Sequence, residues 1–105
     1  MSKEELRNYQ AIQRELTHLE AFLRKVERYE IEELRVEYAK KCADLANRLL
    51  KIEKAIETLG PTERTLMRLR YIDGLQWQAI CMRINYSWQQ THRIHKNALI
   101  KLKDF

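Results

Sequence analysis

A run of polar, basic and aromatic side chains near the C-terminus has the chemistry needed to contact nucleic-acid bases. An arginine such as Arg93 can form a bidentate pair with guanine, and glutamines such as Gln89 and Gln90 can pair in the same way with adenine. A histidine or a lysine can hydrogen-bond bases or phosphates, and a tryptophan can pack on a thymine methyl group or a sugar. The run therefore predicts base contacts by Trp88, Gln89, Gln90, His92, Arg93 and Lys96.

Three further cations, Arg83, Lys101 and Lys103, are suited to phosphates, where a point charge suffices. The alternative interpretation of the whole set is an ordinary polar face of a helix. In that case Trp88 is a partial cap over the preceding helix, or a crystal or dimer contact.

These side chains must be positioned by two short helices joined by a tight turn. Helical segments are predicted at about 62–72, ending at the pair Asp73-Gly74, and at about 76–84, ending at a left-handed Asn85. A third helix begins at Ser87, whose hydroxyl forms the helix cap in a capping box with Gln90. Its inward stripe is predicted as Thr91, Ile94, Ala98 and Leu102 or Leu99, and Trp77 is predicted to face the core. This is the helix-turn-helix pattern, in which the last helix enters the major groove of double-stranded DNA.

Charge and backbone signals separate this module, residues 59–105, from the rest of the chain. It carries eight Lys or Arg residues and three acidic residues, whereas residues 1–58 carry twelve of each and are neutral. Such a basic half favours a polyanionic partner. At the boundary, Gly60 suits the left-handed position after a helix and Pro61 suits the first position of the next helix.

Residues 1–58 are predicted to form a helical oligomerisation or interaction arm. Apolar residues recur at alternating spacings of three and four from Tyr9 to Val26, and again in a shifted phase from Tyr38 to Leu59. A turn within residues 28–33 would fold the two seams together as a hairpin, which the phase shift slightly favours. One long helix, with both seams packed on a partner chain, is the alternative. Either arrangement predicts a homo-oligomer, with a dimer favoured.

Several classes of protein are excluded by what the sequence lacks. Two glycines are too few for a phosphate-binding loop or a dinucleotide fingerprint, and the composition favours an all-α fold. Cys42 and Cys81 match no metal or redox spacing, and no third ligand accompanies His92 and His95, so we expect no metal and no cofactor. No nucleophile and base can be paired, which argues against an enzyme. Without a membrane-length apolar run, a cytoplasmic protein is expected.

Residues 59–102 resemble the fourth conserved region of bacterial sigma factors. The similarity lies in a Pro-Glu-Arg start, an L-R-Y-x-x-G turn and a Ser-capped last helix ending in A-L-x-K-L. The chain is more similar still to the RinA/ArpU-like phage transcriptional regulators, whose recognition helix has a Tyr-Ser start and an H-R-x-H core. Tyr86-Ser87 and His92-Arg93-Ile94-His95 stand at those places. The resemblance implies a sequence-specific DNA-binding regulator, an activator of late phage genes acting in a bacterial host, with RNA polymerase as a possible partner.

Two alternatives and two departures from the sigma pattern accompany this hypothesis. The module can also belong to the DNA-recognition, small-terminase-type subunit of a phage packaging machine. It can also be a sigma mimic that binds RNA polymerase without reading DNA. Gln76 and Ala79 replace the capping residue and the acid that usually begin the second helix, and Trp88 and Gln89 replace an Arg followed by a Glu. We therefore expect the docking mode of a sigma factor, but a different DNA sequence as the target.

Overall fold

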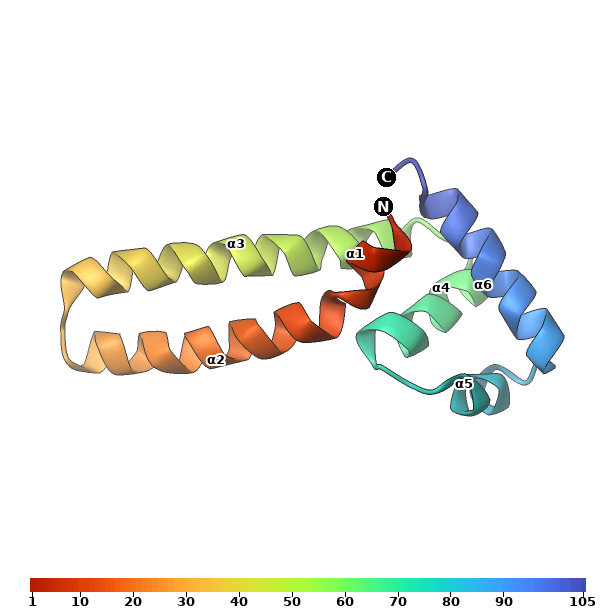
Figure 1. The fold of residues 1–105 in the computed structure, drawn as a ribbon, viewed down its shortest axis with the longest axis horizontal. Helices are drawn as coiled ribbons and strands as arrows, with labels where there is room; N and C mark the ends of the chain where they lie inside the picture. The colour runs from red at the N-terminus through yellow and green to blue at the C-terminus, as the bar shows by residue number, and fades with distance from the viewer. The chain divides into compact units, whose positions relative to one another are not determined.

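The computed structural model describes residues 1–105, all of whose regular elements are helical, as predicted. Figure 1 shows their order. None of these helices is long and apolar enough to cross a membrane. The elements are α1 (Lys3–Arg7), α2 (Tyr9–Arg28), α3 (Glu32–Glu57), α4 (Pro61–Met67), the π-helical turn η1 (Arg68–Ile72), α5 (Trp77–Ile84) and α6 (Trp88–Leu102).

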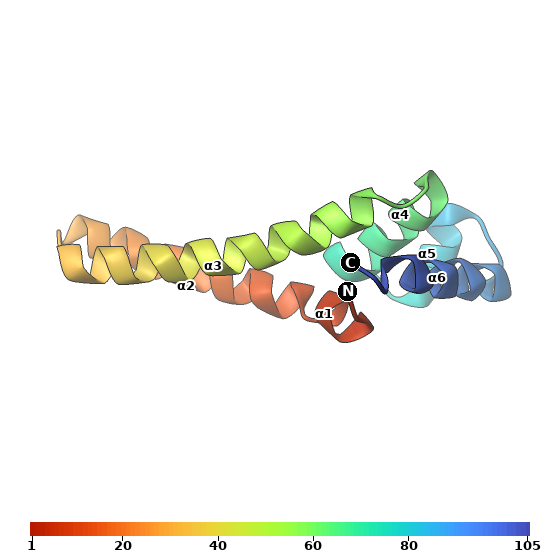
Figure 2. The ribbon, with the colours of Figure 1, turned by 90° about the horizontal axis from the view of Figure 1, so that it is seen from above.

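The two heptad seams belong to two antiparallel helices, so the hairpin prediction is confirmed and the single long helix is wrong. Helices α2 and α3 lie side by side in both views (Figures 1 and 2). The turn falls at residues 29–31, where Glu30 adopts a left-handed φ of 56°. The N–H of Ile31 donates to the carbonyl of Val26 at 3.3 Å, which is the long bond of a Schellman ending. A glutamate replaces the usual glycine here, and for this reason no breaker residue marks the turn in the sequence.

Residues 11–51 form one compact unit, in which the seams supply the buried side of each helix. Ile12 and Val26 of α2 and Leu45 and Leu49 of α3 are buried. Near the turn the rings of Phe22 and Tyr38 pack with their centroids 4.7 Å apart. The alternating spacing of three and four thus places the apolar residues of each helix toward its neighbour within the same chain.

The second compact unit combines residues 1–10 with residues 52–105, which differs from the predicted division after residue 58. Its core takes side chains from widely separated parts of the sequence, because α1 and the end of α3 pack with the C-terminal helices. The fully buried large side chains are Leu6, Ile56, Leu66, Met67, Ile80, Leu102 and Thr91. Each of these aliphatic residues contributes roughly 1.5–3 kcal/mol through burial, so the unit depends on its N-terminal ten residues as well as on its helix-turn-helix.

Helix α1 itself was not anticipated as a separate element. Ser2 accepts from the amide of Glu5 and the Glu5 side chain accepts from the Ser2 amide, which is a capping box. The amino group of Met1 donates to the carbonyl of Leu102 at 2.7 Å, and this bond brings the beginning of the chain to the end of α6.

The segment between α3 and α5 agrees with prediction except at one glycine. Pro61 begins α4 as expected, but Gly60 has a φ of −64° and is the N-cap of α4, so the predicted left-handed conformation is wrong. After η1, Gly74 has a φ of 72°, and the amide of Leu75 donates to the carbonyl of Leu69 at 2.9 Å. The predicted turn at Asp73-Gly74 is therefore the place where a left-handed residue is needed.

Candidate nucleic-acid interface

The turn between α5 and α6 is built as the sequence predicted. Asn85 is left-handed, with φ 62° and ψ 39°, and its N–H donates to the carbonyl of Cys81. Ser87 then caps α6 by accepting from the amide of Gln90 at 3.2 Å. The Gln90 side-chain oxygen accepts from the amide of Ser87 at 3.1 Å. These local bonds fix where α5 ends and where α6 begins.

Helix α6 is held by an inward stripe that includes one residue outside the predicted set. Thr91, Ala98 and Leu102 are fully buried, as predicted, and the Cys81 thiol donates to the Thr91 hydroxyl at 3.3 Å. Ile94 is only half-buried. The additional member is His95, which the sequence indicated as a flanking or packing residue; it has 6% exposure, and its Nε2 lies 2.7 Å from the hydroxyl of Tyr71.

The buried position of His95 keeps its ring neutral. Burial, followed by the nearby charges of Lys3, His92, Arg70 and Arg7, lowers the pKa of this imidazole from 6.5 to about 4. Burial also raises the pKa of the Tyr71 phenol. Near neutral pH the two residues form an uncharged hydrogen-bonded pair on the buried side of α6.

The opposite side of α6 presents cations and amides to solvent without any acidic residue. Gln89, Arg93 and Lys96 are exposed, and neither cation takes part in an ion pair. Trp88 is 54% exposed at the first turn of the helix. The structure thus brings these four predicted base-contact residues to the N-terminal part of α6, on its solvent-exposed side.

Two other predicted base contacts are engaged within the protein. The His92 ring lies between Trp77 and Trp88, with centroid distances of 4.6 and 4.5 Å, and its Nε2 is buried without a hydrogen-bond partner. His92 is therefore not displayed to a base, because its place on α6 faces the start of α5. Gln90 uses its side-chain oxygen in the Ser87 cap, which leaves only its amide nitrogen for the bidentate adenine contact expected of it.

The three predicted phosphate contacts also differ in availability. Arg83 and Lys103 are exposed and have no ion-pair partner. The Lys101 ammonium instead lies 2.7 Å from a carboxylate oxygen of Glu63 on α4. A phosphate would have to compete with this carboxylate, so Lys101 is the weakest of the three candidates.

The structure shows no cluster of side chains that could form a metal site. No group of three or more His, Cys, Asp or Glu side chains is arranged to hold a metal ion, and both cysteines are free.

The sequence did not predict the pairing of Tyr71 with His95 or the cations that α1 brings beside this pair. The Ser2–Glu5 capping box is the one signal that marks this helix. Comparisons with protein-family models, with curated proteins and with solved structures find no match.

Proposed function

We propose that the protein is a sequence-specific, double-stranded DNA-binding transcriptional regulator that places α6 in the major groove. The observation that carries the proposal is the form of α5 and α6. A left-handed Asn85 and a Ser87 cap join two helices, the second of which displays Arg93, Lys96 and Gln89 on its free side. This combination of a supported helix with cations and amides is what base recognition in the major groove requires.

The proposed roles follow the exposure of each side chain. Arg93 pairs with guanine and Gln89 with adenine, while Trp88 packs on a thymine methyl group or a sugar. Arg83, Lys96 and Lys103 neutralise phosphates. Three such contacts predict that log K falls with log salt at a slope of about −3 for each bound copy. The histidines support α6 from inside rather than touch DNA.

The resemblance to RinA/ArpU-like regulators supports the biological part of the proposal, which is activation of late phage genes in the cytoplasm of a bacterial host. In the H-R-x-H segment, the two histidines are turned toward the protein and Arg93 alone is exposed. This arrangement suits a recognition helix in which Arg93 contacts a base and the two histidines pack against the rest of the protein. RNA polymerase is the further partner that an activator of this kind would contact.

We also propose that two copies associate through the hairpin. The seams are used within the chain, so a dimer needs another surface. Val36, Ala43 and Leu50 lie at seven-residue intervals on α3 and are exposed, with Val36 at 56% and Leu50 at 60%. Such a strip lies away from the seam and fits a second copy. Light scattering should give the mass of a dimer; a monomer would refute this part, and a ring would favour the packaging machine.

The reading role of α6 is tested by substituting Arg93. Duplexes selected from a random pool with the wild-type chain supply the specific site. Arg93→Ala should weaken binding to that site by about 1–3 kcal/mol and hardly change binding to random DNA. Arg24→Ala, which removes an exposed arginine from the hairpin, is the matched control and should change neither. Equal losses on both DNAs would show that α6 does not read bases, and failure to enrich any sequence would refute specific binding.

A further inference from the structure

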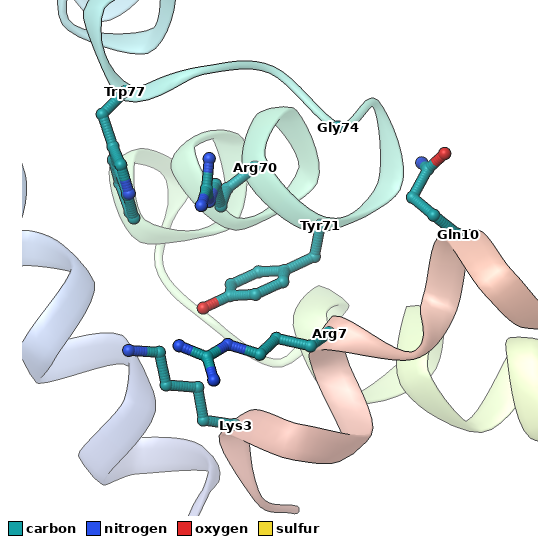
Figure 3. Close-up of a pocket in the computed structure, with 7 residues that line it drawn as sticks. All are labelled: Lys3, Arg7, Gln10, Arg70, Tyr71, Gly74 and Trp77. Atoms are coloured by element: carbon teal, nitrogen blue, oxygen red, sulfur yellow. The ribbon is translucent and has the colours of Figure 1, made fainter.

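A polar cavity lies on the compact unit formed by residues 1–10 and 52–105, apart from the residues assigned to base reading. Its volume is about 280 Å³. Figure 3 shows that side chains from α1, the first turn of α2, η1 and the start of α5 surround it. The lining residues are Lys3, Arg7, Gln10, Arg70, Tyr71, Gly74 and Trp77.

Positive charge dominates this cavity. Three of its lining side chains are cationic and none is a carboxylate. Lys3 forms no ion pair, and Arg7 pairs only with the exposed Glu4, at 3.0 Å. In Figure 3 the ends of Lys3 and Arg7 extend in the same direction, toward the side on which the Tyr71 hydroxyl lies. The positive field also reaches the buried His95, because Lys3, Arg70 and Arg7 each lower the pKa of that imidazole.

The remaining wall is fixed in place by contacts inside the protein. The Arg70 guanidinium donates to the Leu75 carbonyl at 3.0 Å and lies 4.7 Å over the Trp77 ring. Gln10 donates to the carbonyl of Ile72, so residues 1–10 are attached to the end of η1 within this unit. Gly74 has no side chain to fill the opening. Lys3 and Arg7 are the exposed cations of the cavity, with Glu4 as the ion-pair partner of Arg7, while Arg70 provides a fixed charge in the wall.

We propose that this cavity binds a phosphate group through Lys3 and Arg7, with Arg70 as the fixed positive wall. Guanidinium and ammonium groups are the donors that a phosphate requires, and the one carboxylate paired with them is that of Glu4, which lies exposed on α1 beside Arg7. The volume lies near the lower limit for ligand sites, which suits one or two phosphate groups rather than a large molecule.

The phosphate can come from a DNA backbone or from a free phosphate compound. Trp77 connects the cavity to the DNA-facing end of α6, because its ring contacts His92, whose ring in turn contacts Trp88. The DNA source rests on the proposed function, whereas a free phosphate does not. In the DNA case, α1 adds two backbone contacts to those made by the helix-turn-helix.

The first measurement titrates the full chain with inorganic pyrophosphate, in the absence of DNA, by calorimetry. The test variant is Lys3→Gln with Arg7→Gln, since both side chains are exposed and carry no part of the core. The control is Arg14→Gln with Lys40→Gln, which removes two exposed cations from the hairpin. If the cavity holds free phosphate compounds, the test variant should bind about tenfold more weakly or worse, and the control should match the wild type.

The second measurement compares the salt dependence of DNA binding for the same three proteins. Loss of two phosphate contacts should reduce the slope of log K against log salt by about two units. A fourfold rise in salt would then weaken the wild type roughly tenfold more than the test variant. Circular dichroism and thermal melting of each variant check that the fold is retained.

Either result supports the proposal and identifies the source of the phosphate. The proposal is overturned if the test variant equals the control in both measurements. A wild-type chain that binds no DNA would refute only the proposed function, because the pyrophosphate titration still tests whether the cavity binds phosphate.

Discussion

Acidification should destabilise this protein through one buried imidazole. The ring of His95 is neutral in the folded chain because burial, followed by nearby positive charges, lowers its pKa from 6.5 to about 4. In the unfolded chain the same ring takes up a proton near its ordinary pKa. As pH falls from 6.5 toward 4, the unfolded state therefore binds the extra proton first, and stability is lost over that range.

The size of this effect follows from the two pKa values. Each unit of difference corresponds to about 1.4 kcal/mol, so the full loss below both values is about 3 kcal/mol. At about pH 4.5 most of it, about 2.5 kcal/mol, should have appeared, and at about pH 7.5 almost none. This is a large part of the stability expected for a chain of this size.

Carboxylates also titrate in this range, so the measurement compares the wild type with His95→Gln by urea unfolding at several pH values. The substitution should cost stability at neutral pH, because Gln cannot reproduce the fit against Tyr71 and Trp77. The difference between the two proteins should then shrink by about 2.5 kcal/mol between about pH 7.5 and about pH 4.5. Parallel stability curves would show that His95 is not kept neutral by the fold and would refute the reasoning.

Four further substitutions test the local structure by urea unfolding at neutral pH. Ser87→Ala should cost about 1 kcal/mol by removing the cap of α6, and an unchanged stability would mean that the cap is unimportant. Gly74→Ala should cost about 1 kcal/mol because φ is 72°, although the new Cβ meets Gln10 no closer than 3.4 Å. Gly60→Ala is the control: its φ is ordinary and the space around it is open, so stability should change by less than about 0.5 kcal/mol. Ile80→Ala should cost about 2–5 kcal/mol, since the side chain is fully buried, and a smaller loss would indicate a loosely packed core.

Much of the helix-turn-helix follows from interactions that span only a few residues. The Ser87 cap and the left-handed Asn85 are decided within one turn of helix, so residue types alone located the end of α5 and the beginning of α6. Spacing similarly showed which side of α6 is buried, apart from His95. The exposed Arg93 and Lys96 were predicted on this basis, and their contact with DNA stays a prediction.

The fold of the hairpin depends partly on local sequence and partly on tertiary packing. The phase shift between the two seams indicated two helices, but Glu30 carries the left-handed turn without a glycine. Packing of the seams on either side of the turn outweighs the conformational cost of a glutamate there, about 1 kcal/mol. The prediction for Gly60 failed for the converse reason. Its sequence context suits a helix end, yet the chain uses it to begin α4.

By itself, the sequence determined the helical class, the turn between the last two helices and the basic character of the C-terminal half. Only the tertiary structure decided which polar groups remain free. Tyr71 and His95 are 24 residues apart, and Lys101 and Glu63 are 38 residues apart, yet each pair meets. The N-terminal cations reach the cavity only because α1 packs with the C-terminal helices. A hydrogen bond or charge pair depends on distance in space, and no periodicity within one helix determines what another helix brings to that place.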